Sequence, residues 1–133
     1  MQKFLRLEFI PVNSDLGLLV LRLWLGLTML CLHGWGKLTH FSAAMGSFPD
    51  PLHVGSTTSL LLAVFAEVVC SVLLVLGLFT RLAAFFLVVT MVVACFIVNG
   101  GKLAGNGELA FLYLAGYVLL LLAGAGRYSV DKK

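Results

Sequence analysis

Two charged residues lie well inside long apolar stretches of the chain, Arg22 in the first stretch and Glu67 in the second. An ionised side chain near the centre of a bilayer costs several kcal/mol, about 2.5–3.5 on insertion scales, so such residues normally face the protein interior and pair. Arginine and a carboxylate can pair through two parallel hydrogen bonds. We therefore predict an Arg22–Glu67 ion pair, either as a structural lock between two helices or as part of a cavity for the polar head of a hydrophobic molecule such as a quinone.

Further polar residues extend this predicted seam. His33 and Lys37 follow Arg22 at steps of three or four along one helix face, and Ser71 follows Glu67 by one turn. Near the outer ends of the apolar stretches, Asn99 and Glu108 complete a polar cluster, which is either a cavity mouth or a set of headgroup-facing residues with a capping carboxylate. The candidate ligand-binding residues are Arg22, His33, Lys37, Glu67, Ser71 and Glu108.

Histidine and cysteine spacings predict neither a metal site nor a dithiol centre. The histidines match no metal-ligand pattern, and the cysteines are single residues in separate apolar stretches. We expect the cysteines to behave as small hydrophobic side chains. These residues are His33, His40 and His53, and Cys31, Cys70 and Cys95.

The elements that must position these residues are membrane helices. The chain has 133 residues, of which 61% are hydrophobic and 11% charged, whereas a soluble domain has about 25% charged residues. Four apolar stretches, each about as long as a bilayer is thick, predict an all-α, integral membrane four-helix bundle that forms one domain. The predicted helices span about 16–33, 57–79, 82–98 and 108–124, with a long extracytoplasmic loop over 34–56.

The distribution of basic residues predicts the orientation. With four spans, both termini and the middle connection share a side that carries Lys3, Arg6, Arg81, Arg127, Lys132 and Lys133, whereas the other side carries Lys37 and Lys102. Cytoplasmic segments carry the excess of Lys and Arg, so both termini are predicted to be cytoplasmic. The net charge of +3 is too small to favour a nucleic-acid partner.

An ordered set of short motifs resembles the DoxX family of small bacterial membrane proteins. Most of the chain, from about Asp15 to Asp131, carries the resemblance. The motifs are Leu21-Arg22-Leu23 with Gly26, His33-Gly34-Trp35-Gly36-Lys37-Leu38, Glu67, Leu76-Gly77-Leu78-Phe79-Thr80-Arg81, Glu108 and the tail Gly124-Ala125-Gly126-Arg127-Tyr128-Ser129-Val130-Asp131.

This resemblance implies a four-helix protein of the bacterial inner membrane that is associated with redox processes. The family takes its name from a subunit of a thiosulfate:quinone oxidoreductase, and other members are linked to membrane oxidoreductase complexes. Many relatives have a histidine near the end of the third helix, where this chain has Cys95-Phe96-Ile97-Val98-Asn99. That departure weakens the transfer of a proton-relay or metal role to this helix.

The function we predict is an accessory subunit of a membrane redox system that binds a quinone or another lipid-like molecule at the polar seam. No motif for a covalently held cofactor is present, so electrons would require a redox partner protein, and membrane lipids and further copies of the chain are the other expected partners. One alternative is a transporter of the small multidrug-resistance type, disfavoured because an arginine partner would keep Glu67 ionised. A thiol oxidoreductase is disfavoured by the unpaired cysteines, and a non-catalytic membrane scaffold remains open.

Overall fold

A computed structural model describes residues 1–98, 100–101 and 105–131 of this protein. All regular secondary structure in these residues is helical. A short helix near the N-terminus precedes four longer helical rods, and one single-turn helix lies in the first long connection. In chain order these are α1 (Gln2–Leu5); a first rod of α2 (Ser14–Met29), η1 (Leu30–Gly34) and α3 (Trp35–Thr39); α4 (Phe41–Ala44); a second rod of α5 (Ser56–Val64), η2 (Phe65–Cys70) and α6 (Ser71–Leu76); a third rod of α7 (Thr80–Val92) and η3 (Val93–Val98); and α8 (Asn106–Ala123).

Three of these rods are long and apolar enough to cross a membrane. They span Ser14–Thr39, Ser56–Leu76 and Thr80–Val98, with 26, 21 and 19 residues, and a crossing helix needs about 20. The predicted all-α membrane helical bundle is confirmed at this level. The fourth rod, α8, is apolar but shorter, so its crossing of the membrane stays a prediction.

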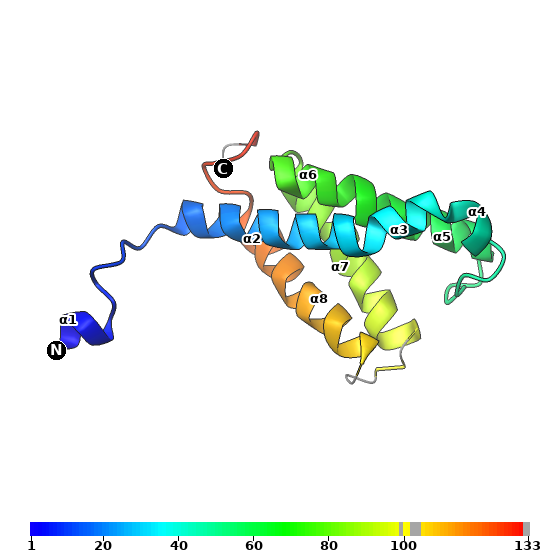
Figure 1. Cartoon of the computed structure of the whole chain (residues 1–133), viewed down its shortest axis with the longest axis horizontal. Coiled ribbons are helices and arrows are strands. Elements are labelled where there is room, and N and C mark those ends of the chain that lie inside the picture. Colours follow the sequence, from blue (N-terminus) through cyan, green and yellow to red (C-terminus); the bar gives the residue numbers. More distant parts are fainter. Residues whose placement is uncertain (99, 102–104, 132–133) are drawn as a thin grey trace.

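The rods form two layers (Figure 1). The first rod lies alongside α5 and α6, while α7 and α8 pack against each other and cross beneath them at an angle. Alanine, leucine and tyrosine side chains fill the space between the layers, including Ala84, Leu87, Tyr117 and Leu120, all of them fully buried. Both described ends of the chain lie toward the same end of the first rod, with α1 standing apart from the bundle.

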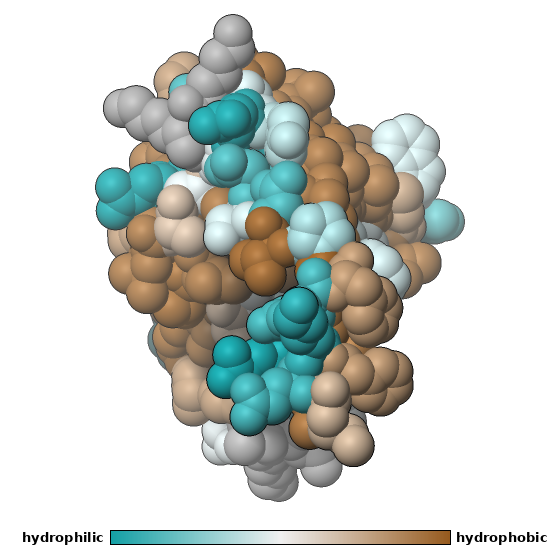
Figure 2. Space-filling view, turned by 90° about the vertical axis from the view of Figure 1, so that its left-hand side faces the viewer, coloured by the Kyte–Doolittle hydropathy of each residue, from teal (hydrophilic) through white to brown (hydrophobic). Residues whose placement is uncertain are grey.

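The outer surface is largely apolar. Trp24 and Leu122, for example, are 70% and 76% exposed. Figure 2 views the molecule from the end where α1 lies, and shows apolar residues on both flanks with hydrophilic residues gathered in a strip between them. Such a surface is unfavourable in water and favourable against lipid.

Each of the three membrane-length rods contains a π-helical turn, namely η1, η2 and η3. A π turn inserts one extra residue and therefore rotates the side chains that follow it relative to a continuous α-helix. The apolar periodicity did not predict these turns, because hydrophobic residues on all sides of a membrane helix hide a shift of one position.

Two helix ends differ from the predicted ones. The first rod continues to Thr39, so part of the expected 34–56 loop is helical. Gly34 lies inside this rod, where a Cβ would be 2.7 Å from the Glu67 carbonyl oxygen, so glycine permits close packing of the two helices. The second rod ends at Leu76 because Gly77 (φ 71°) and Phe79 (φ 50°) adopt left-handed conformations.

Candidate ligand-binding site

The intramembrane carboxylate is paired with a lysine. The Lys37 Nζ atom lies 2.6 Å from Oε1 and 2.7 Å from Oε2 of Glu67. The Glu67 side chain is 4% exposed and that of Lys37 is 32% exposed. Side chains on a helix lean toward its N-terminus, so Lys37, near the end of the first rod, leans back toward the middle of the bundle and reaches η2.

The predicted Arg22–Glu67 ion pair is wrong. Arg22 is completely buried, and its guanidinium donates hydrogen bonds to backbone carbonyl oxygens instead. Nε donates to Ala125 (3.0 Å), Nη1 to Leu74 (2.9 Å) and Val75 (3.3 Å), and Nη2 to Tyr128.

The same geometric rule explains the error. Arg22 lies near the start of the first rod and leans toward the N-terminal end of that rod, away from Glu67. There it meets the C-terminal end of α6, whose last carbonyl groups lack partners within the helix and carry partial negative charge. The spacing of residues along each helix correctly placed Arg22 and Glu67 on inward faces. Spacing does not show, however, toward which end of the helix each side chain leans.

Around Arg22 the C-terminal tail folds back onto the turn between α6 and α7. The Val130 and Asp131 amides donate to the carbonyl oxygens of Leu76 (3.2 Å) and Gly77 (2.8 Å). The Asp131 carboxylate accepts hydrogen bonds from the first amides of α7, at Phe79 and Thr80, both at 2.9 Å. We call this arrangement of residues 76–80 and 125–131 around Arg22 the arginine clasp.

The clasp leaves no room for side chains larger than hydrogen at Gly77, where a Cβ would lie 2.6 Å from Arg22 Nη1 and 2.3 Å from the Ser129 Cβ. Partial burial acts to raise the pKa of Asp131, but the amides of Thr80 and Phe79 and the charge of Arg22 outweigh it and hold this pKa below its ordinary value. Three of the sequence motifs, those around Arg22, at 76–81 and at 124–131, thus meet at one structural feature, which the linear sequence did not reveal.

A cavity of about 530 Å³ adjoins the Lys37–Glu67 pair in the half of the bundle remote from the clasp. All three π turns contribute to its wall, and most of the remaining lining is apolar. The lining residues are Met29, His33, Lys37, Phe48, Pro49, Pro51, Leu52, Ser59, Leu62, Ala63, Phe65, Ala66, Glu67, Phe86, Val89, Thr90, Met91, Val93, Ala94, Val98, Leu109, Ala110 and Tyr113. The size lies in the range of small-molecule sites, about 300–1,000 Å³, and π turns are frequent at functional sites.

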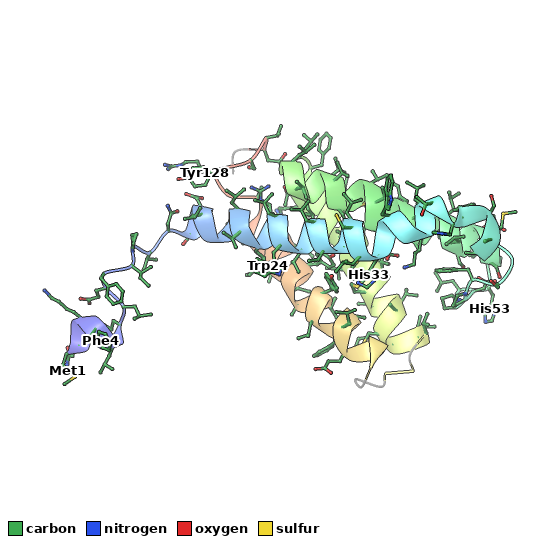
Figure 3. The ribbon with its side chains drawn as sticks, in the orientation of Figure 1. Met1, Phe4, Trp24, His33, His53 and Tyr128 are labelled. Carbon is green, nitrogen blue, oxygen red and sulfur yellow. The ribbon has the colours of Figure 1, made fainter. Side chains whose placement is uncertain are left out.

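Few polar groups face this cavity. His33 extends from the first rod toward α7 and α8 (Figure 3) and contacts the Tyr113 ring edge to face, at 5.7 Å between centroids. Lys37 Nζ lies 5.9 Å from the centre of the Phe48 ring. The ammonium group has three N–H donors, of which two are used by the Glu67 carboxylate. The third donor is therefore available to a ligand in the cavity.

The first long connection covers the cavity with Phe48, Pro49, Pro51 and Leu52. Asp50 fixes this segment to the start of α5, because its carboxylate accepts from the Ser59 hydroxyl (2.8 Å) and from the amides of Val54 (3.0 Å) and Gly55 (2.8 Å). These hydrogen bonds, that of Ser59 first, hold the pKa of Asp50 below its ordinary value. The sequence analysis missed this covering segment; the Pro-Asp-Pro run was its local signal.

The remaining candidate residues lie elsewhere. Of the six, the structure brings His33, Lys37 and Glu67 together at the cavity, whereas Arg22 belongs to the clasp. Ser71 is buried and does not line the cavity, and its hydroxyl has no hydrogen-bond partner among the described residues. Glu108 is exposed in the first turn of α8 and does not line the cavity. Asn99 lies outside the described residues.

Among the described residues, no three His, Cys, Asp or Glu side chains lie close enough together to hold a metal ion. His53 lies on the connection near α5, well apart from His33 (Figure 3). Cys70 and Cys95 are buried and Cys31 is exposed, all three as free thiols.

Fold and site together define a small multi-helix membrane protein with an ion pair at the wall of a cavity. The chain belongs to the DoxX family, whose model matches residues 17–100. It is 40% identical over 116 residues to an uncharacterized protein of Haemophilus influenzae, an alignment that covers 79% of this chain and 81% of that relative. A second uncharacterized protein of the same organism is 27% identical over 127 residues, covering 90% of this chain and 84% of the relative. No solved structure matches the chain.

Proposed function

We propose that this DoxX-family membrane protein binds a neutral, carbonyl-bearing amphiphile of the quinone class in the cavity beside Lys37 and Glu67. The observation that carries the proposal is the neutral ion pair with one unused ammonium donor at the wall of an otherwise apolar cavity. The pair has no net charge, so a charged ligand would lack a counter-charge there. A ligand carbonyl can accept the remaining Lys37 N–H without breaking the pair.

The residues that face the cavity fit such a ligand. Lys37 would orient one carbonyl oxygen, and Glu67 would hold the ammonium group in place. His33 also lines the cavity and offers a ring nitrogen that can form a hydrogen bond with the ligand. The flat rings of Phe48, Phe65, Phe86 and Tyr113 offer apolar faces to a planar head.

For the cellular role, we propose an accessory subunit of a membrane redox system. The support is the family membership together with the cavity chemistry. A quinone supplies two-electron redox chemistry when bound, and the electrons would pass to or from a separate partner protein. We further propose four membrane spans, location in the bacterial inner membrane and cytoplasmic termini, supported by the excess of Lys and Arg on the side of the termini.

Glu67 argues against the transport alternative. A proton-coupled exchanger alternates its carboxylate between a proton and a substrate, whereas both oxygens of Glu67 already accept hydrogen bonds from Lys37 within the same chain. The scaffold alternative has no use for the cavity, and the binding experiment separates it from our proposal.

The binding experiment titrates the detergent-purified protein with a short-chain benzoquinone and follows the complex by native mass spectrometry. Replacing Lys37 by Met removes a charged donor, a loss of about 1.5–3 kcal/mol or roughly 10- to 100-fold in affinity. Lys3→Met is the matched control, because Lys3 is exposed on α1 far from the cavity. A wild-type protein that binds no quinone, or equal binding by Lys37→Met, would contradict the proposal.

Charge selectivity gives a second test of the same site. In Glu67→Gln the ammonium group of Lys37 loses its counter-charge, so we expect weaker preference for the quinone and new binding of an anionic amphiphile such as a fatty acid. Glu108→Gln removes the same charge outside the cavity and should behave as wild type. Fatty-acid binding that is already strong in the wild type would argue for a different ligand class.

A further inference from the structure

One part of the cavity wall comes from two helices that diverge. Within the second rod, η2 packs against α7, but α5 continues away from α7, so the two form a V (Figure 1). At the apex, the rings of Phe65 and Phe86 meet nearly perpendicularly, with 5.5 Å between centroids and 79° between planes. The arms of the V carry Leu62 on α5 and Val89 on α7, each about one helical turn beyond the apex.

These four apolar side chains face both the cavity and the outside of the bundle. All of them line the cavity, and yet Leu62, Phe65, Phe86 and Val89 are 52%, 42%, 38% and 45% exposed. They lie within the membrane-length rods, where the surroundings are lipid tails. On the other side of the cavity, between the first rod and α8, His33 and Tyr113 are in contact.

The cavity therefore has a polar wall at Lys37 and Glu67 and an apolar opening toward the bilayer. A ligand that matches this arrangement has a polar head and a long apolar chain. Its head can lie at the ion pair while its chain remains in lipid, so the chain needs no volume inside the cavity and loses no apolar contact. A head without a chain would leave the exposed rims of the V unused.

We propose that the V between α5 and α7 is a lateral portal through which a long-chain amphiphile enters from the bilayer and through which its chain remains extended into lipid. The inference rests on the proposed function, which identifies the head, and adds the chain and the route. Leu62 and Val89 form the rims of the portal and Phe65 with Phe86 its floor.

The test compares a benzoquinone that has no side chain with the same ring carrying a decyl chain. Leu62→Trp and Val89→Trp place a bulky ring in the portal. Leu61→Trp and Val92→Trp are the matched controls, since these residues lie on the same two helices, are 58% and 37% exposed, and do not line the cavity. Affinities come from native mass spectrometry, and each variant is compared with wild type in the same detergent so that partition into micelles cancels.

We expect the portal variants to lose about tenfold or more in affinity for the decyl quinone and less than about twofold for the ring alone. The controls should match wild type with both ligands. Leu62→Ala widens the portal without adding bulk, so it should bind the decyl quinone at least as well as wild type and guards against a folding defect in the Trp variants.

Suppose the wild type binds quinone in a way that depends on Lys37. The portal is then overturned, and the head site kept, if Leu62→Trp and Val89→Trp lose equal affinity for both ligands or lose affinity for neither. Equal losses in the control variants would also overturn it. If the ring and the decyl quinone both fail to bind the wild type, the proposed head chemistry itself is wrong and the portal loses its ligand. A diacyl phospholipid could also co-purify with the wild type and be missing only from the portal variants. That result would identify the ligand chain as that of a lipid and refute the quinone head.

Discussion

Lys37 and Glu67 should be strongly coupled in stability, whereas Arg22 and Glu67 should act independently. Replacing Lys37 by Met leaves a carboxylate that is only 4% exposed without its cation, which costs about 3–5 kcal/mol when a buried pair is broken. Glu67→Gln is milder, at about 1.5–3 kcal/mol, because the amide oxygen can still accept a hydrogen bond and Lys37 is 32% exposed.

The double variant Lys37→Met with Glu67→Gln contains neither buried charge, so its loss should be smaller than the sum of the single losses by about 2 kcal/mol. For Arg22→Met with Glu67→Gln the losses should add to within about 0.5 kcal/mol. The reason is distance: the Arg22 guanidinium contacts the carbonyl of Leu74, seven positions and roughly 10 Å along the rod from Glu67.

The assay is reversible unfolding in mixed micelles with increasing dodecyl sulfate, followed by the fluorescence of Trp24 and Trp35. Lys3→Met, on the exposed α1, serves as the control for a change of net charge. A coupling above about 1 kcal/mol between Arg22 and Glu67, together with additive losses for Lys37 and Glu67, would refute the assignment of partners.

Three further predictions concern the clasp and the helix contact that supports the ion pair. Arg22→Lys keeps the charge but replaces three separated nitrogens with one, so we expect a loss of about 1.5–3 kcal/mol and faster proteolysis of the C-terminal tail, with ligand binding unchanged. Because the folded state lowers the pKa of Asp131, its stabilisation is complete above its unfolded pKa of about 3.9 and is lost as the pH falls through the folded value; unfolding measured between about pH 2 and 6 should show an acid loss that is smaller in Asp131→Asn, which keeps only the contribution of carboxylates such as Asp50. Gly34→Ala places a methyl group 2.7 Å from the Glu67 carbonyl oxygen and should weaken both stability and quinone binding, whereas Gly36→Ala, with nothing within 4 Å, should change neither.

Much of the fold was predictable because hydrophobic length is a strong physical signal. The apolar stretches predicted the rods, and the cost of an intramembrane charge correctly marked Arg22 and Glu67 as buried. Their partners were not predictable from the same reasoning. A helical face specifies the direction around the helix axis, but the lean of the side chain along the axis and the rotation introduced by π turns decide which neighbour is reached.

The two cations on the inward face of the first rod, Arg22 and Lys37, lie in different halves of the molecule and have different partners. In one half, Arg22 donates hydrogen bonds to backbone carbonyl oxygens at the end of α6 and in the tail. Its guanidinium group therefore stabilises the fold and does not line the cavity. In the other half, Lys37 is held by a side chain rather than by the backbone and retains one donor beside the cavity. Arg22, which donates to four backbone carbonyl oxygens, ties α6 and the tail to the first rod. Substitutions around η1, η2 and η3 should therefore change ligand binding, whereas substitutions in the arginine clasp should change stability.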